Sequence, residues 1–364
     1  MTAGQLPWDV DAFRAAVQQT LEAFVAEHGR RLAPLGEDAA RLVAAAERSV
    51  TGGKRFRAAF CYWGFHAVHA RPGAGEALGE EGALLRAASA LELLHASALV
   101  HDDFLDASDT RRGQPAAHRA FAALHRARGW GGDPEQYGGA AAILLGDLLL
   151  AWSDELLRTC GLPAARVADA LVCFDATRSE VIAGQFLDVS LQARGESDVA
   201  QAMRVLRYKS AKYSVERPLN LGAALAGGGP EVQHALSQFG LPLGEAFQLR
   251  DDLLGVFGDP DVTGKPAGDD LTEGKRTVLV ALALERAPAE DAKLLDDRLG
   301  TPLSAQDVQR LRQVIVRSGA PGEVEERIRR LTRRSLAALE KAPVTEESRE
   351  VLRGLATAAT QRVL

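Results

Sequence analysis

The chain has 364 residues and a net charge of −6, and 46% of its residues are hydrophobic and 25% charged. This balance is ordinary for a soluble globular protein. The mild negative charge argues against a dedicated nucleic-acid binder, which would need a basic stripe on its surface. Aromatic residues make up only 5% while alanine and leucine recur throughout, so the composition favours helices over strands.

Several features of the chain bear on its cellular compartment. Its three cysteines are scattered without CxxC spacing, which favours buried thiols in a reducing environment. Residues 1–10 lack the pattern of a secretory signal. The most apolar stretch, residues 140–152, is interrupted by Gly146 and Asp147 and is too short for a membrane span. We therefore expect a cytoplasmic protein with no stable membrane insertion.

Apolar residues recur at helical spacing along almost the whole chain. Pro218 and Pro242 are expected to kink or break two of the helices, and no alternating strand pattern is convincing. The expected helices span residues 10–27, 37–50, 57–69, 79–100, 116–128, 138–159, 164–192, 199–226, 231–257, 270–287, 305–318, 323–341 and 346–363.

The breaks between these helices are short, and none is long enough for an interdomain linker. The sequence therefore predicts one all-α domain over residues 1–364, built as a large helical bundle. The segment from Pro288 onward is charged, with arginine pairs at 329–330 and 333–334, and we interpret it as a solvated helical face.

The first cluster with chemical meaning is GGKRFR at residues 52–57. Its glycines are typical of a helix end, and the next helix begins with three cations that its own dipole disfavours. This cost suggests an anionic partner, with a solvated helix start as the alternative. The full P-loop pattern is absent and no strand precedes the cluster, which argues against a P-loop phosphotransferase.

An acidic cluster, HDDFLD at residues 101–106, follows a strongly apolar helical pattern. Asp102 and Asp106 are four residues apart and share a helix face, while Asp103 and Asp106 are three apart. Like charges at such spacing repel, and converging carboxylates suit a hard divalent cation. Exposed acidic clusters are common, but Arg111 and Arg112 follow this one, and arginine forks bind phosphate oxygens.

Two smaller motifs lie in mid-chain, GQ at residues 184–185 with Asp188, and YKS at residues 208–210 with Lys212. Taken singly, each is more readily explained as structural.

A second acidic cluster, FQLRDDLL at residues 247–254, also ends an apolar helical pattern. A glycine-rich segment with alternating acids and bases follows, and Lys265 and Lys275 within it can reach phosphates as point charges. In both clusters an apolar helix ends in Asp-Asp and cations follow. Two such sites facing each other could hold metals on both sides of a diphosphate.

Together these motifs resemble the trans-isoprenyl diphosphate synthase (polyprenyl synthetase) family. They occur in the family's order and run over well more than half of the chain. The long arrangement is highly specific, although DDxxD alone is weak. The matches are GGKRxR at 52–57, DDxxD at 102–106, RRG at 111–113, GQ at 184–185, KS at 209–210, FQxxDD at 247–252 and GK at 264–265.

The resemblance implies an all-α isoprenoid synthase fold of about a dozen helices around a deep central cavity. The two Asp motifs would face each other across the mouth of that cavity. The resemblance also implies three Mg²⁺ ions, two bound by the first motif and one by the second. The implied metal ligands are Asp102, Asp103, Asp106, Asp251 and Asp252.

The resemblance further implies two substrates, isopentenyl diphosphate and an allylic diphosphate. The allylic diphosphate would be held by the metals, aided by Arg111, Lys209 and Lys265. Isopentenyl diphosphate would be bound by Lys54, Arg57, His95 and Arg112.

Two positions depart from the family's pattern. The second motif usually reads DDxxD, but its last position in this chain is Gly255, and Asp259 four residues later is a possible substitute. Two acids can also suffice, since Mg²⁺ keeps several waters. Ser210 stands where threonine is common, which keeps the hydroxyl group.

The implied chemistry is prenyl transfer. The C–O bond to the allylic diphosphate ionises while metals and cations stabilise the leaving group. The double bond of isopentenyl diphosphate attacks the allylic cation and a proton is then lost. An apolar cavity prevents hydrolysis of the cation, and only weakly nucleophilic dipoles can approach it. Gln248, which can also contact substrate, and the region of Lys209 and Ser210 are the candidate catalytic dipoles.

Two other classes remain open. A class I terpene cyclase also uses Asp-rich Mg²⁺ sites, but it would not need the second diphosphate pocket that Lys54, Arg57 and Arg112 suggest. A noncatalytic regulatory subunit of a heteromeric prenyl synthase would be supported by loss of either Asp-Asp pair, yet both are present. The family resemblance and the prevalence of two-fold oligomers predict a homodimer.

Product length is predicted from the helix that leads into Asp102. Ala98 and Ser97 stand four and five residues before Asp102, about one turn or roughly 6–8 Å below the acids. Both are small where large aromatics would form a floor, so a growing chain can pass toward Leu94 or Leu91. This predicts a product longer than C15, with geranylgeranyl diphosphate (C20) favoured. The alternative is that these residues only permit close helix packing and another wall sets the length.

Overall fold

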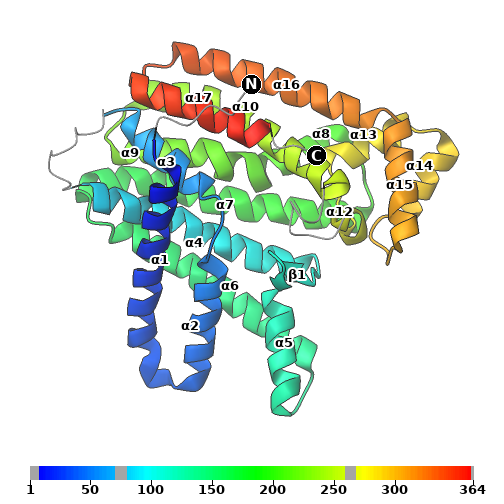
Figure 1. Cartoon of the computed structure of the whole chain (residues 1–364), viewed down its shortest axis with the longest axis horizontal. Helices are drawn as coiled ribbons and strands as arrows, with labels where there is room; N and C mark the ends of the chain where they lie inside the picture. The colour runs from blue at the N-terminus through cyan, green and yellow to red at the C-terminus, as the bar shows by residue number, and fades with distance from the viewer. Residues whose placement is uncertain (1–7, 70–79, 259–267, 362–364) are drawn as a thin grey trace. The chain divides into compact units, whose positions relative to one another are not determined.

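The computed structural model describes residues 8–69, 80–258 and 268–361. These residues are almost wholly helical (Figure 1), which confirms the predicted all-α class. The chain forms two compact units. The first contains residues 1–174, 218–233 and 343–352, and the second contains residues 175–217, 234–342 and 353–364. The assignment of one domain to residues 1–364 stays a prediction.

The first unit holds the N-terminal helices and a short β-hairpin. Within it, α1 and α2 lie side by side as a helical hairpin joined by η1 (Figure 1). Its elements are α1 (Val10–Leu32), η1 (Ala33–Leu35), α2 (Glu37–Val50), α3 (Phe56–His66), α4 (Glu81–Leu105), β1 (Thr110–Arg111), β2 (Gln114–Pro115), α5 (Ala117–Arg128), α6 (Pro134–Arg158) and nearly all of α9 (Arg217–Leu225).

The second unit holds the C-terminal helices, and four helices, α7, α9, α10 and α17, have residues in both units. A buried core of mostly Leu, Val and Ala side chains lies among α8, α10, α13, α15 and α16. The elements are α7 (Ala164–Arg194), α8 (Val199–Val205), η2 (Leu206–Glu216), α10 (Pro230–Phe257), α12 (Asp269–Glu273), α13 (Val278–Arg286), α14 (Ala289–Arg298), α15 (Ala305–Arg317), α16 (Ala320–Lys341) and α17 (Glu346–Thr360).

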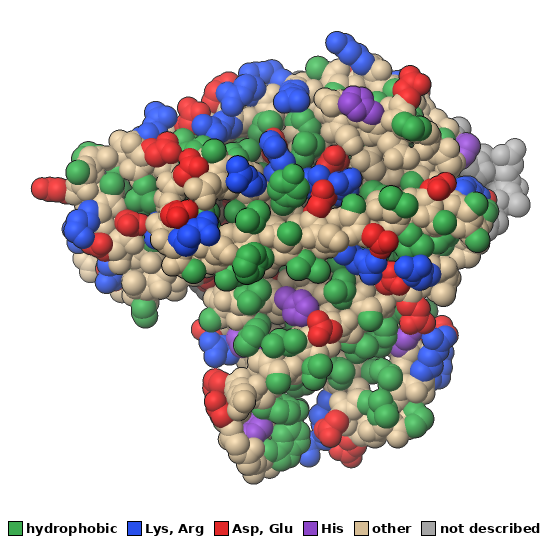
Figure 2. Space-filling view, turned by 180° about the vertical axis from the view of Figure 1, so that it is seen from behind, with side chains coloured by type: hydrophobic (Ala, Val, Ile, Leu, Met, Phe, Trp, Pro, Cys, Tyr) green, Lys and Arg blue, Asp and Glu red, His purple; other side chains and the backbone are tan. Residues whose placement is uncertain are grey.

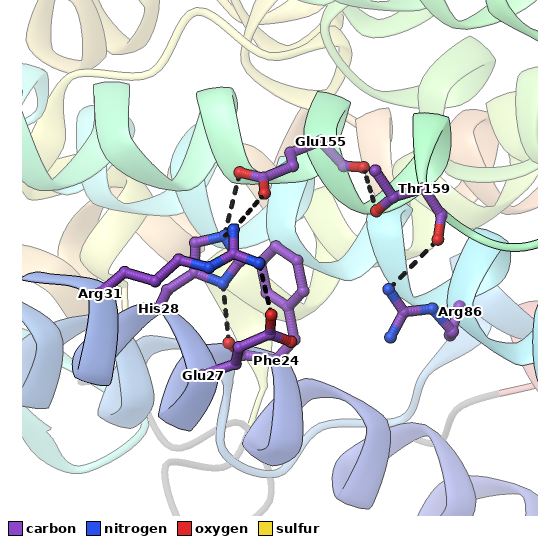
Figure 3. A network of polar contacts seen from close by, with 7 residues as sticks. All are labelled: Phe24, Glu27, His28, Arg31, Arg86, Glu155 and Thr159. Atoms are coloured by element: carbon purple, nitrogen blue, oxygen red, sulfur yellow. Dashed lines mark hydrogen bonds and ion pairs between the residues drawn. The ribbon is translucent and has the colours of Figure 1, made fainter.

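A polar network fastens α1 to α6 in the first unit (Figure 3). Glu155 of α6 accepts a hydrogen bond from Nη1 of Arg31 at 2.9 Å, and its Oε2 lies 3.0 Å from Nε2 of His28. Burial by itself would raise the pKa of Glu155, but the hydrogen bonds from His28 and Arg31 outweigh it and lower that pKa. Nearby, Arg86 of α4 donates to the carbonyl oxygen of Thr159 at 3.3 Å.

The burial of α4 and of the cysteines bears on two expectations, that the chain has no membrane span and that its thiols are buried. Among the described residues one helix, α4, is long and apolar enough for a membrane span, but 67% of its most apolar window is buried inside the protein. A core helix has this character. Cys61 and Cys160 are buried free thiols as predicted, while Cys173 is half-buried.

Two local predictions are wrong. The helix expected over residues 199–226 changes type, because its middle is the π-helix η2, which ends just before Pro218. The helix expected over residues 270–287 is two helices, α12 and α13, separated at Gly274, whose φ is 79° and whose left-handed conformation ends α12. Pro242 lies inside α10 without breaking it.

Other elements were not predicted at all. Residues 33–35 form the short 3-10 helix η1, residues 289–298 form α14, and residues 110–115 form the antiparallel hairpin of β1 and β2. The hairpin turn is made by Arg112 and Gly113, with φ of 52° and 71°. Positive φ at both central residues is typical of tight hairpin turns, and strands of two residues are too short to show an alternating pattern.

Candidate active site

The first acidic cluster lies at the C-terminal end of α4, in the first unit. The N–H of Asp106 donates to the carbonyl oxygen of Asp102 at 2.8 Å, which closes the last turn of the helix. Asp102 and Asp106 are half-buried, while Asp103 is only 3% exposed. The expected shared face of Asp102 and Asp106 therefore exists, and Asp103 points into more crowded surroundings.

Two glycines of α6 allow that helix to approach the acidic end of α4. A Cβ on Gly146 would lie 2.1 Å from Nε2 of His101, and one on Gly139 would lie 2.6 Å from Cε2 of Phe104. Real Cβ atoms do not come so close to other heavy atoms. These glycines therefore hold the acidic turn in place by close packing.

Arg111 and Asp103 form an ion pair. The Nε of Arg111, on β1, donates to Oδ1 of Asp103 at 2.8 Å and to Oδ2 at 3.1 Å, and Nη2 donates to Oδ1 as well. The resemblance assigns Asp103 to a metal and Arg111 to a diphosphate. In this structure the two groups neutralise each other, and the hairpin β1–β2 presents the guanidinium for this contact.

A carboxylate of α4 contacts the start of α3, and the sequence did not predict this contact. Glu92 of α4 is 5% exposed and accepts from the N–H of Ala58 at 3.1 Å and from Nη1 of Arg55 at 3.2 Å. Arg55 is itself buried, with φ of 54°. One of the three cations at this helix start, Arg55, therefore has a protein carboxylate as its anionic partner. The one feature of the sequence that could have predicted this partner is the single glutamate within the apolar part of α4.

The positive charges of four arginines act on the imidazole of His95. Burial, and then the positive charges of Arg57, Arg112, Arg111 and Arg55, lower the pKa of His95 well below its usual range, so the ring is neutral at pH 7. Burial and the neighbouring guanidinium charges also lower the pKa of Arg112, although that residue as a whole is exposed. We call these five residues the cationic group. Lys54 is exposed at the neighbouring position.

The residues proposed to set product length lie along α4. Ala98 is half-buried, and because it is four residues before Asp102 it shares that residue's helix face. Ser97 and Leu94 are buried, with exposed fractions of 3% and 2%. None of the three is bulky and aromatic, and their role in chain length stays a prediction.

The second acidic cluster lies near the C-terminal end of α10, in the second unit. Asp251 is exposed, whereas Asp252 is 7% exposed and accepts from Nε2 of Gln248 at 2.9 Å. Burial raises the pKa of Asp252 to about 8, with the charges of Asp270 and Asp251 adding to the rise and Gln248 and Lys275 opposing it.

Asp270 of α12 is one of the acids that follow the second cluster in the sequence, and its charge acts on Asp252, although it was not predicted as a metal ligand. Its Oδ1 lies 3.7 Å from Nζ of Lys275, and the same Nζ lies 2.5 Å from Oε2 of Glu273. A Cβ on Gly255 would lie 1.9 Å from Oδ2 of Asp270. Lys275, predicted to reach a phosphate, is thus paired with two acids of its own segment.

Lys209 lies on the π-helix η2 and donates to Oδ2 of Asp188 on α7 at 2.6 Å. The two mid-chain motifs therefore meet. Gly184 permits this contact, since a Cβ at that position would lie 2.4 Å from the backbone nitrogen of Lys209. Lys212 of the same π-helix donates to Glu180 at 2.7 Å, and Ser210 is half-buried. π-helical turns often occur at functional sites.

Two of the predicted positions, Lys265 and Asp259, lie outside the described residues. The two acidic clusters belong to different units, and each has been placed within its own unit.

The oxygen donors of both clusters suit a magnesium ion. Within residues 8–69, 80–258 and 268–361, no three His, Cys, Asp or Glu side chains converge tightly enough to hold a metal by themselves. Magnesium does not require such a cage, since it keeps several waters and is usually bound by one or two carboxylates and substrate phosphates. The repulsion that raises the pKa of Asp252 would also be relieved by a cation. These residues therefore fit magnesium bound together with a diphosphate.

The chain resembles known proteins over most of its length. Residues 39–316 match the family model described as polyprenyl synthetase. The geranylfarnesyl diphosphate synthase of Aeropyrum pernix is 32% identical over 280 residues, which cover 76% of this chain and 82% of that protein. The geranylgeranyl diphosphate synthase of Methanosarcina mazei is 34% identical over 237 residues, which cover 65% of this chain and 64% of that protein.

A solved structure is similar over nearly the whole chain. It is a geranylgeranyl pyrophosphate synthase from Corynebacterium glutamicum, complexed with isoprenyl diphosphate and magnesium. Its sequence is 43% identical, its TM-score is 0.93, and the match covers 98% of this chain and 100% of that one.

Proposed function

Because the chain belongs to the polyprenyl synthetase family, we propose that it condenses isopentenyl diphosphate with an allylic diphosphate and releases pyrophosphate. The allylic substrate is geranyl or farnesyl diphosphate. The product is a longer all-trans prenyl diphosphate, and both acidic clusters act on the same allylic diphosphate.

The observation that carries this proposal is the cationic group around His95. Arg111 and Arg55 are paired with Asp103 and Glu92, whereas the positive charges of Arg57 and Arg112 also act on His95 and would be offset by a bound diphosphate. Arg57, Arg112 and His95, together with the exposed Lys54, form the proposed pocket for isopentenyl diphosphate. A neutral His95 can donate a hydrogen bond to a phosphate oxygen without adding another positive charge.

The acidic clusters hold the allylic diphosphate through magnesium. Asp102, Asp103 and Asp106 would hold two of three ions, and Asp251 and Asp252 the third. When bound, magnesium stabilises the negative charge that develops on the leaving pyrophosphate. Arg111 would exchange its bond to Asp103 for a phosphate oxygen, and Lys265 and Lys275 would add further positive charge.

The remaining assignments concern the allylic cation. Lys209 and Ser210 lie on the π-helix η2, a type of helix that is frequent at functional sites and whose backbone carbonyl groups are polar. Such carbonyl oxygens and the amide oxygen of Gln248 stabilise a cation without attacking it. Lys209 can also contact the diphosphate, at the expense of its ion pair with Asp188.

A C20 product is the most specific part of the proposal. Support comes from the small residues Ser97 and Ala98, and from relatives named as geranylgeranyl diphosphate synthases. Substituting Ser97 or Ala98 with Phe should shorten the product, as judged by chromatography of the dephosphorylated prenyl alcohols. Unchanged chain lengths in both variants would assign length control to another wall.

We further propose that the protein is a cytoplasmic homodimer. Hydrophobic side chains reach the surface on the face drawn in Figure 2. In the first unit, Ile143 and Leu144 of α6 are 44% and 60% exposed, which would be costly if they stayed in water. Leu144→Asp should shift the mass measured by light scattering from dimer to monomer, and a wild-type monomer at micromolar concentration would contradict the proposal.

One experiment separates the proposed function from its competitors. The purified chain is incubated with magnesium, farnesyl diphosphate and labelled isopentenyl diphosphate, and both pyrophosphate release and label transfer are measured. Prenyl transfer requires the two in equal amounts. Pyrophosphate without label transfer would indicate a cyclase, and neither product would indicate a noncatalytic subunit.

A further inference from the structure

Gly255 of α10 has a carboxylate where a side chain would otherwise stand. It lies three residues after Asp252 and four after Asp251, so it shares their side of the helix. A Cβ built on Gly255 would lie 1.9 Å from Oδ2 and 2.5 Å from Cγ of Asp270. Asp270 comes from α12 and is 9% exposed. Its carboxylate therefore fills the space of the side chain that residue 255 lacks.

Asp270 is buried together with Asp252 near the end of α10. The two residues are 9% and 7% exposed. Lys275 lies beside them, with its Nζ 3.7 Å from Oδ1 of Asp270 and 2.5 Å from Oε2 of Glu273. Oxygen donors gathered in this way suit a hard divalent cation.

We propose that Asp270 supplies the carboxylate missing from the second acidic cluster, and that it positions the divalent cation bound there with a diphosphate. This inference rests on the proposed function. In a continuous DDxxD motif this carboxylate would come from α10, whereas in this chain it comes from α12. The glycine at 255 is then required, because any side chain there would displace the carboxylate of Asp270.

The first test measures metal binding rather than turnover. Mn²⁺ is titrated calorimetrically into the full-length protein in the presence of inorganic pyrophosphate. Asp270→Asn keeps the shape of the side chain and should weaken Mn²⁺ binding about 10–100-fold, the usual loss for a residue supporting a metal site. Asp269→Asn, on the same short helix, is the matched control and should stay within about twofold of wild type.

Equal Mn²⁺ affinities for Asp270→Asn and wild type would overturn the inference, and so would equal losses in Asp270→Asn and Asp269→Asn. This outcome is independent of the proposed function. Failure of the wild-type protein to transfer a prenyl group would contradict the function, yet it would leave the Mn²⁺ comparison with pyrophosphate interpretable.

A second variant tests the role of the glycine. Gly255→Ala adds a methyl group that must displace the Asp270 carboxylate, so it should weaken Mn²⁺ binding as much as Asp270→Asn does. Because both changes remove the same group from the same place, the double variant should be no weaker than either single variant. Additive losses would contradict the shared position. If Gly255→Ala does not fold, as judged by circular dichroism, the comparison of Asp270→Asn with Asp269→Asn decides.

Discussion

At the scale of single residues, several side chains that would bind ligand are already paired with opposite charges. Arg111 is paired with Asp103, and Lys209 with Asp188. Substrate and metal would therefore replace ion pairs of the protein with ion pairs to the ligand, so the side chains are held in place beforehand at a cost in affinity. The sequence predicted these residue types, but it could not predict their partners, because each pair joins two separate elements.

The acids themselves should be indispensable. Asp102→Ala or Asp251→Ala should abolish turnover while leaving the helical circular dichroism signal intact, because each removes an oxygen donor from a half-buried or exposed position at a helix end. Asp38→Ala on α2, whose side chain is 84% exposed, should behave as wild type. Normal rates in Asp102→Ala or Asp251→Ala would remove that cluster from the site.

The cations near α3 should act on one substrate. Lys54→Ala and Arg57→Ala should each raise KM for isopentenyl diphosphate about tenfold or more, because a charge-assisted hydrogen bond is worth about 1.5–3 kcal/mol. KM for the allylic substrate should change less. Lys293→Ala, a surface lysine whose side chain is 74% exposed, is the control. An unchanged KM for isopentenyl diphosphate would place both residues outside the pocket.

Asp252 should make stability depend on pH in the absence of divalent cations. Its pKa is raised to about 8 in the folded protein, whereas an aspartate in the unfolded chain titrates near pH 4. Between these values the folded state binds more protons, so the free energy of unfolding falls as the pH rises. The melting temperature of wild type relative to Asp252→Asn should therefore fall from pH 5 to pH 8. A constant difference would contradict the raised pKa.

At the scale of elements, periodic apolar residues predicted most helices close to their observed bounds. The prediction for residues 117–128 was one residue too long, and that for α7 ended two residues early. It failed where tertiary contacts decide the backbone. Nothing local distinguishes the π-helix η2 from an α-helix, and Gly274 ends α12 within a sequence that otherwise continues the helical pattern. Glu92 and Asp270 were missed because only the fold brings them to their clusters.

The packing of α7 against η2 depends on a missing side chain. Gly184→Ala would place a Cβ 2.4 Å from the backbone nitrogen of Lys209, and forcing the two elements apart should cost about 1–3 kcal/mol of stability. Turnover should fall too, because the ion pair of Lys209 with Asp188 is disturbed. The matched control is Gly82→Ala on α4, which meets nothing within 4 Å. Equal melting temperatures for the two variants would contradict this packing role.

At the scale of the whole molecule, the order of motifs was more informative than any motif alone. The all-α class and the family follow from motifs between residues 52 and 265, and the family model matches residues 39–316. The chain forms two compact units, and the central cavity and the single domain remain predictions. Sequence spacing also could not predict that Asp270 of α12 occupies the space of the side chain that Gly255 lacks.

The product that the wild-type protein makes tests the proposed prenyl transfer and its chain length together. The protein is incubated with magnesium, labelled isopentenyl diphosphate and, in separate reactions, geranyl and farnesyl diphosphate, and the dephosphorylated products are separated by chromatography. We expect label in an all-trans C20 alcohol from both starters, and none when the metal is chelated. A product that ends at C15 from geranyl diphosphate would contradict the open floor at Ser97 and Ala98. No label in any prenyl alcohol would contradict prenyl transfer itself.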